Sequence, residues 1–177
     1  MTQRQEFRVL RTFSDFELRE YKPCVLAEVK VRAQYSTATS AAFGSLFRYI
    51  SKGNSSSEKI AMTAPVIAAQ HEDNTAANEW FVSFVMPSGS TYGRMPQPND
   101  SEVILRELDT QICVAHSFRG QASAERAKKE INKLRTAAAR EKISLSSESR
   151  ICRFDPPFKP GFLQYNEIVI PQLVIHS

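Results

Sequence analysis

The sequence predicts an α+β fold made of two copies of a strand–strand–helix–strand–strand unit. The tripeptide Leu-Arg-Glu occurs at residues 18–20 and again 87 positions later, at residues 105–107. Carried along the chain, this offset aligns the strand-like and helix-like segments of the two halves in the same order. We place the first repeat at about residues 15–87 and the second at about residues 102–171, inside one domain of residues 1–177. The segment that joins the repeats carries the Pro, Gly, Ser and Asn expected of a loop.

Length and composition describe an ordinary globular domain. The chain has 177 residues, of which 42% are hydrophobic and 24% charged, and its net charge is +4. A small positive charge weakly favours anionic partners and does not by itself predict nucleic-acid binding. Three widely spaced cysteines do not form a disulfide framework and are typical of a reducing compartment. The charged first residues lack the apolar stretch of a signal peptide, and no apolar run reaches the roughly 18 residues of a membrane span. We therefore expect a cytoplasmic monomer without a membrane span.

Apolar runs predict the strands of both repeats. They lie at residues 16–21, 23–31, 59–66, 80–86, 103–108, 110–118 and around 168–170. The run at 59–66 alternates between apolar and polar residues, but Pro65 cannot donate a hydrogen bond to a sheet, which predicts an edge or a bulge. The run at 80–86 is apolar on nearly both faces and predicts a central strand.

The first helix is predicted from near Ser36 to a stop at Gly53. An apolar stripe at helical spacing is expected to be its buried face, formed by Phe43, Leu46, Phe47 and Ile50. Ser40 and Gly44 lie in a strip of small residues at the edge of this stripe. Such a strip lets either a strand of the same domain or a ligand approach the backbone, and strand packing is the favoured interpretation.

The second helix is predicted from Ser123 to about Lys142. Its buried stripe is expected to consist of Ala127, Ile131, Leu134 and Ala138. Seven basic residues on the outer face outnumber three acidic ones. We interpret this surface as a solvated face, with a nucleic-acid footprint as the less favoured alternative.

Residues 154–162 carry three prolines and three phenylalanines. The prolines exclude a regular helix and predict a stiff extended loop. A stiff aromatic loop can form the wall of a ligand site or cap the core of the protein itself, and the sequence leaves both interpretations open.

A search for catalytic chemistry finds no established motif. The sequence has no G-x-S-x-G, no H-E-x-x-H, no P-loop and no G-x-G-x-x-G. His71 and His176 lie in polar or terminal positions and are expected to be exposed. Cys113 and His116 are three residues apart in a predicted strand, so their side chains point to opposite faces and cannot share a metal ion. We therefore predict neither an enzyme nor a metal site, and a structural role for His116.

A longer pattern of motifs runs through nearly the whole chain. It consists of FGSLFRYISKGN (43–54), KIAMTAPV (59–66), WFVSFVMP (80–87), FRG (118–120), RFDPPFKPGF (153–162) and NEIVIP (166–171). In this order, from about Phe7 to Gln172, the pattern resembles the SOUL haem-binding family. The MTAPV core together with the DPP…NE ending is its most specific part.

The resemblance implies a fold and a function. SOUL proteins have two strand–strand–helix–strand–strand repeats that form a distorted antiparallel β-barrel flanked by two helices. They bind haem or other tetrapyrroles non-covalently, with proposed roles as carriers or buffers, and they look similar to bacterial effector-binding domains for flat hydrophobic ligands. A porphyrin has wide apolar faces and two propionates, so it requires an apolar cleft with cations at the rim.

The resemblance also assigns site residues. In haem-binding relatives the cleft lies between the first helix and the Pro-rich loop, here Arg153 to Phe162. The corresponding cofactor-binding positions are Ser40, Phe43, Phe47, Arg48, Asp155, Pro156, Pro157, Phe158 and Lys159. We expect Phe43 and Phe47 to face the macrocycle with Phe158 opposite. Arg48, with Lys159 as the second candidate, is expected to pair with the propionates.

Two positions depart from the family pattern. A basic residue of the best-characterised relatives corresponds to Ser40, and a histidine proposed as the axial ligand in another relative corresponds to Glu20. We therefore expect weak axial ligation or none, so that haem and metal-free tetrapyrroles bind comparably. The alternative function is a SOUL-fold protein-interaction or regulatory module that has lost the ligand and binds a protein partner.

Overall fold

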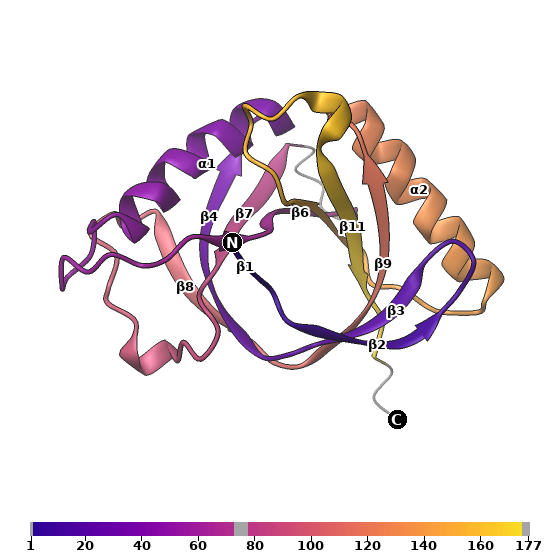
Figure 1. The fold of residues 1–177 in the computed structure, drawn as a ribbon, viewed down its shortest axis with the longest axis horizontal. Helices are drawn as coiled ribbons and strands as arrows, with labels where there is room; N and C mark the ends of the chain where they lie inside the picture. Colours follow the sequence, from indigo (N-terminus) through magenta and orange to yellow (C-terminus); the bar gives the residue numbers. More distant parts are fainter. Residues whose placement is uncertain (1, 73–77, 175–177) are drawn as a thin grey trace.

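The computed structural model describes residues 2–72 and 78–174 and shows two helices packed on one strongly curled sheet (Figure 1). Within these residues the sheet has nine strands in the order β2-β3-β9-β11-β10-β6-β7-β4-β8, and every neighbouring pair is antiparallel. The α+β class is thereby confirmed. The expected barrel needs a correction, because β2 and β8 are edge strands and the sheet is an open half-barrel.

The elements follow one another in this order: β1 (Gln3–Arg4), β2 (Phe7–Thr12), β3 (Glu17–Tyr21), β4 (Cys24–Arg32), α1 (Tyr35–Ile50), β5 (Thr63–Ala64), β6 (Val66–His71), β7 (Glu79–Val85), η1 (Tyr92–Arg94), β8 (Val103–Leu108), β9 (Gln111–Arg119), α2 (Ala124–Arg140), β10 (Glu148–Arg153), η2 (Gly161–Leu163) and β11 (Tyr165–Pro171). Both helices lie on the outer side of the curled sheet (Figure 1). The duplication of a strand–strand–helix–strand–strand unit stays a prediction.

Strand β7 lies inside the sheet, between β4 and β6. Val82 and Phe84 on this strand are 0% and 2% exposed. The central position predicted for residues 80–86 is confirmed. Its side chains contribute to the main core beneath α1.

The predicted strand at residues 59–66 is wrong in its extent. Thr63 and Ala64 form the short strand β5, which pairs in parallel with β1 in a separate two-stranded sheet, and Val66 already belongs to β6. Pro65 separates β5 from β6. Because proline lacks the N–H that a sheet ladder requires, the regular pairing resumes only at Val66.

Helix α1 buries a different face from the one predicted. Leu46 and Ile50 are buried as expected, but Phe43 and Phe47 are 38% and 50% exposed. The helix packs on β4 and β7, and its small and aromatic positions fill that contact, among them Ala42 and Tyr49. Phe43 and Phe47 therefore stack on each other at the outer edge, with ring centroids 5.9 Å apart. The strip of small residues at Ser40 is likewise exposed.

Helix α2 follows its sequence signals closely. The Oγ of Ser123 accepts a hydrogen bond from the backbone N–H of Arg126 at 3.2 Å, which caps the first turn. Ala127, Leu134 and Ala138 are buried as predicted. Ile131 is only partly buried, because it faces the space between the two helices.

Candidate functional site

A cleft of about 960 Å³ lies between the first halves of α1 and α2, over strands β6, β7 and β10. Binding sites for small molecules are typically about 300–1,000 Å³. The sheet supplies the floor and the two helices supply the walls. The lining residues are Gln34, Tyr35, Ser36, Thr39, Ser40, Gln70, Glu72, Asn78, Trp80, Gln121, Ala122, Ser123, Ala124, Glu125, Ala127, Lys128, Ile131, Asn132, Ser149, Ile151, Arg153, Pro157 and Gln164.

The apolar part of the cleft is aromatic and aliphatic. The rings of Tyr35 and Trp80 lie 5.0 Å apart and are tilted by 52°. Ile151 from β10 and Ile131 from α2 complete this surface. Strand alternation explains the positions of Ile151 and Arg153: both point to the helix-facing side of β10, and Arg150 and Cys152 point to the other side.

Arg153 is fixed at the floor of the cleft by residues of α1. Its Nε donates to Tyr35 Oη at 3.0 Å and its Nη2 donates to Thr39 Oγ1 at 3.2 Å. The guanidinium also lies 5.2 Å from the centre of the Tyr35 ring. Burial raises the pKa of Tyr35, and the Arg153 charge offsets part of that rise. These partners are neutral oxygens, so they orient the guanidinium without neutralising its charge.

The opposite wall adds a second cation, Lys128 on α2. Two carboxylates also line the cleft, of which Glu72 forms an ion pair with Arg135 at 2.9 Å and Glu125 lies in the first turn of α2. None of the described lining residues is His, Cys or Met. The site therefore offers flat apolar contact and cations, and among the described lining residues Tyr35 alone is of a type that ligates haem iron.

The sequence-predicted helix residues divide between two surfaces. Ser40 lines the cleft, where its Oγ donates to the Ser36 carbonyl at 3.0 Å. Phe43, Phe47 and Arg48 do not line it and lie exposed further along α1. The Arg48 Nη2 atom is 3.8 Å from a carboxylate oxygen of Asp100 and is mostly exposed.

The loop residues also divide. Pro157 lines the cleft, whereas Asp155 holds the loop together: its carboxylate accepts from Lys159 Nζ at 3.1 Å and from the backbone N–H of Tyr165 at 2.7 Å. The Tyr165 N–H in particular, together with Lys159, lowers the pKa of Asp155. The loop does not bring Phe158 to the cleft, since its side chain is 88% exposed. Pro156 is exposed beside it and does not line the cleft either.

Several lining residues were missed by the sequence reasoning. In the sequence, four of them look like ordinary core residues of helices and strands: Tyr35, Trp80, Ile131 and Ile151. Lys128 looks like one cation among several on a solvated helix face. Only the packing of α1 and α2 over the same sheet brings them together. The family position at Glu20 lies outside the cleft, on β3, where its carboxylate accepts from Arg8 at 2.9 Å.

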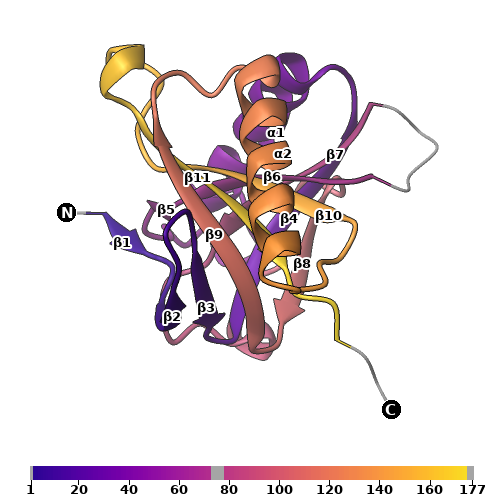
Figure 2. The same ribbon diagram turned by 90° about the vertical axis from the view of Figure 1, so that its right-hand side faces the viewer.

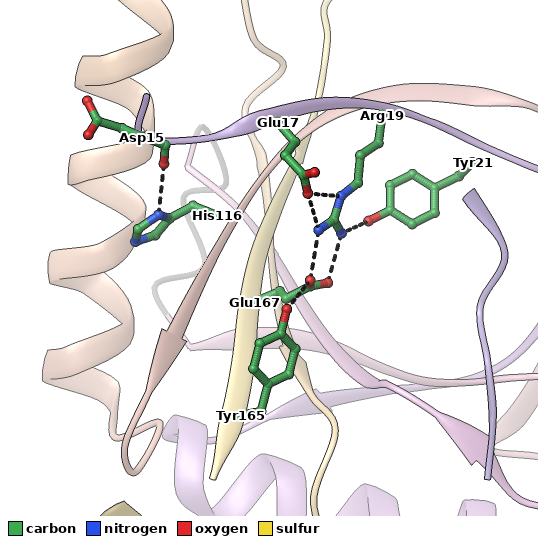
Figure 3. A network of polar contacts seen from close by, with 7 residues as sticks. All are labelled: Asp15, Glu17, Arg19, Tyr21, His116, Tyr165 and Glu167. Atoms are coloured by element: carbon green, nitrogen blue, oxygen red, sulfur yellow. Dashed lines mark hydrogen bonds and ion pairs between the residues drawn. The ribbon is translucent and has the colours of Figure 1, made fainter. Parts of the chain in front are cut away.

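On the face of the sheet that the helices do not cover, a network of charged and polar side chains lies beside a second apolar cluster (Figure 3). Arg19 donates to both carboxylate oxygens of Glu167, at 3.0 and 2.9 Å, and each side chain is 5% exposed. Glu17, Tyr21 and Tyr165 bond to this pair. Because each buried charge has a partner, we interpret the network as structural.

His116 lies on the helix-facing side of β9, and the structural role expected for it stays a prediction that its contacts favour. Its Nδ1 lies 3.1 Å from the Asp15 carbonyl (Figure 3), and its Nε2 lies 2.7 Å from Glu130 of α2. Cys113 lies in the core of the other face. Among residues 2–72 and 78–174, no group of three or more His, Cys, Asp or Glu side chains could hold a metal ion. His71 is exposed, and His176 lies outside the described residues.

Comparisons with solved structures find the same fold in proteins of very different sequence. The C-terminal domain of EcmrR has a TM-score of 0.65 at 13% identity, over 96% of this chain and 99% of that one. A hydrolase from Listeria innocua has a TM-score of 0.61 at 10% identity, over 90% of this chain and 92% of that one. SAV2435, solved with tetraphenylphosphonium bound, has a TM-score of 0.53 at 9% identity, over 90% and 94%. At these identities the likeness concerns the fold alone.

Three further findings complete the description. No helix in the described part of the chain combines the length and apolar character needed to cross a membrane. No curated protein sequence matches the chain. The family model described as SOUL heme-binding protein matches residues 2–171, which confirms the resemblance carried by the motifs. The chain belongs to the SOUL heme-binding protein family.

Proposed function

We propose that the protein binds haem or a related tetrapyrrole non-covalently in the cleft between α1 and α2, as a carrier or buffer rather than as an enzyme. Membership of a heme-binding family supports the class of ligand. The observation that carries the location is the 960 Å³ cleft, in which aromatic surface and an oriented arginine occur together.

The lining of the cleft fits the chemistry of a porphyrin. Tyr35, Trp80 and Ile151 offer apolar contact for the faces of the macrocycle. Arg153 presents a guanidinium whose fork matches a propionate, and Lys128 on the other wall suits the second propionate. Arg153 and Lys128 favour an anionic ligand, and of the two carboxylates in the lining Glu72 is already paired with Arg135.

The cleft favours binding that does not depend on the metal. A bound haem supplies an iron centre, and the residues of this cleft supply apolar contact and charge rather than an axial imidazole or thiolate. The Tyr35 hydroxyl is engaged by Arg153 and its pKa is raised by burial, which disfavours the tyrosinate form needed for ligation. Metal-free protoporphyrin should therefore bind with an affinity within about threefold of that of haem.

The proposal is tested by titrating the purified protein with haem and with protoporphyrin. Binding should shift the Soret band and quench the fluorescence of Trp80, which lines the cleft. No spectral change and no quenching at tens of micromolar pigment would overturn the proposal. Tight binding of haem with no binding of metal-free protoporphyrin would show that the iron is ligated and would refute the metal-independent site.

One observation favours a second candidate function, a protein-interaction module. Phe43 and Phe47 stack on the outer surface of α1, outside the cleft, at 38% and 50% exposure. Stacked rings on a helix surface can form the central anchor of a larger protein interface. This function predicts a stable protein complex that Phe43→Ser/Phe47→Ser disrupts, formed by protein that shows no affinity for either pigment.

A further inference from the structure

The loop between β10 and β11 carries the two most exposed large hydrophobic side chains of the described residues. Phe158 is 88% exposed and Phe162 is 77% exposed, and Leu163 beside them is 44% exposed. Figure 2 shows this loop projecting away from the sheet. Apolar side chains that gather on one exposed segment mark candidate interaction sites of folded proteins.

The loop is not extended as predicted, because it contains a turn closed by the Lys159 N–H on the Pro156 carbonyl and the short helix η2, and its own polar contacts hold this shape. Asp155 binds the Lys159 ammonium and the Tyr165 N–H, and Gln164 Nε2 donates to the Lys159 carbonyl at 2.9 Å. Three prolines restrict the backbone further. The two rings are therefore presented to solvent by a preorganised loop, and little conformational entropy is lost when they dock.

The surroundings of the rings are basic. Arg119 lies beside the loop, where its Nη1 donates to the Leu163 carbonyl at 3.1 Å. Lys159 next to Phe158 is paired with Asp155, which leaves Arg119 as the excess cation here, and the whole chain carries a net charge of +4. The loop also borders the cleft, because Pro157 and Gln164 line it. Figure 1 shows the loop next to the end at which both helices begin.

We propose that this loop docks on the surface of an anionic lipid bilayer, with Phe158 and Phe162 inserted at the boundary between headgroups and acyl chains. Two protruding rings are too small for a stable protein interface, which buries about 1,200–2,000 Å². They match the shallow insertion of apolar side chains into a membrane surface. Basic groups beside them add attraction to anionic headgroups, which supplies the second contribution that peripheral binding needs.

Docking in this orientation turns one end of the cleft toward the bilayer. A hydrophobic pigment can then pass between lipid and protein without crossing bulk water. This consequence rests on the proposed function. The docking itself does not, because its contacts come from the outer loop and not from the lining of the cleft.

The test is sedimentation of pigment-free protein with vesicles of phosphatidylcholine, with and without phosphatidylglycerol. The wild type should bind the anionic vesicles and bind the neutral ones more weakly. Phe158→Ser/Phe162→Ser should lower the partition coefficient by about tenfold or more, since each ring loses apolar burial. The matched control is Tyr92→Ser/Ile104→Ser, whose side chains are 46% and 59% exposed elsewhere on the surface. It should bind like the wild type.

Four results would overturn the proposal. In the first, the wild type does not sediment with anionic vesicles. In the second, Phe158→Ser/Phe162→Ser binds the vesicles as well as the wild type, which would mean that charge alone causes the adsorption. Equal binding to neutral and anionic vesicles would remove the role of the basic groups. A wild-type dimer without lipid that the loop variant does not form, measured by sedimentation velocity, would show that a second copy covers the rings. Because pigment is absent throughout, failure here leaves the proposed function untouched.

Discussion

Removing one partner of the Arg19–Glu167 pair should destabilise the protein far more than removing both. The two N–H···O bonds are 3.0 and 2.9 Å long, and each side chain is 5% exposed. Glu167→Leu leaves the guanidinium with the partly exposed Glu17 as its charged partner. Arg19→Met leaves a buried carboxylate with the hydroxyl of Tyr165. An uncompensated buried charge costs about 3–5 kcal/mol, a large part of the roughly 5–15 kcal/mol that stabilises a domain.

Urea unfolding, followed by far-UV circular dichroism and Trp80 fluorescence, measures these changes as free energies of unfolding. Arg19→Met/Glu167→Leu removes both charges and should fall within about 2 kcal/mol of the wild type, so the double-mutant cycle yields a coupling energy of several kcal/mol. Pigment affinity should be unchanged in the double variant, because the network lies on the sheet face away from the cleft. Single variants that cost less than about 1 kcal/mol, or costs that simply add, would refute the reasoning.

Three other predictions concern stability and reactivity. Burial alone raises the pKa of Glu130, but hydrogen bonds from His116 and Arg126 lower it overall. The ionised carboxylate therefore adds to the free energy of unfolding at neutral pH, and this contribution is lost in acid. Glu130→Gln should cost about 1–3 kcal/mol at pH 7, and the difference should shrink below about pH 4.3 in urea titrations. Burial raises the pKa of the Cys113 thiol to about 11, so Ellman's reagent at pH 8 should modify the partly exposed Cys24 first and reach Cys113 only on unfolding. Gly53→Ala would place a methyl group 2.4 Å from a carbonyl oxygen at the end of α1 and should lower the melting temperature, whereas Gly93→Ala, with open space around it, should not.

Local sequence signals predicted the helices and strands well where a residue pattern is compatible with only one structural role. Ser123 caps α2 as its hydroxyl predicts, and the apolar run around Phe84 lies in the middle of the sheet. The burial of α1 was harder, because helical spacing admits two overlapping stripes. The small Ala42 lets the helix approach the sheet, and Phe43 and Phe47 are displaced to the outer edge. Periodicity alone could not rank these stripes.

The candidate site depends on contacts between distant parts of the chain. Arg153 of β10 reaches Tyr35 of α1, 118 residues earlier, and Trp80 joins them from β7. The family resemblance located one wall of the cleft through Ser40 and Pro157. The second wall, from α2, has no local signature, since Lys128 differs in no visible way from the other cations of that helix. Likewise, nothing in the sequence pairs Arg19 with Glu167, 148 residues away.

The most direct test of the account compares protoporphyrin affinity in Arg153→Gln and Arg48→Gln. The sequence reasoning favours Arg48 as the propionate partner, whereas the geometry favours Arg153, which lines the cleft. A lost charge-assisted hydrogen bond is worth about 1.5–3 kcal/mol, or roughly 10- to 150-fold in affinity. We predict this loss for Arg153→Gln and a change of less than about twofold for Arg48→Gln. The reverse ranking would contradict the account and place the pigment on the outer face of α1, against Phe43 and Phe47.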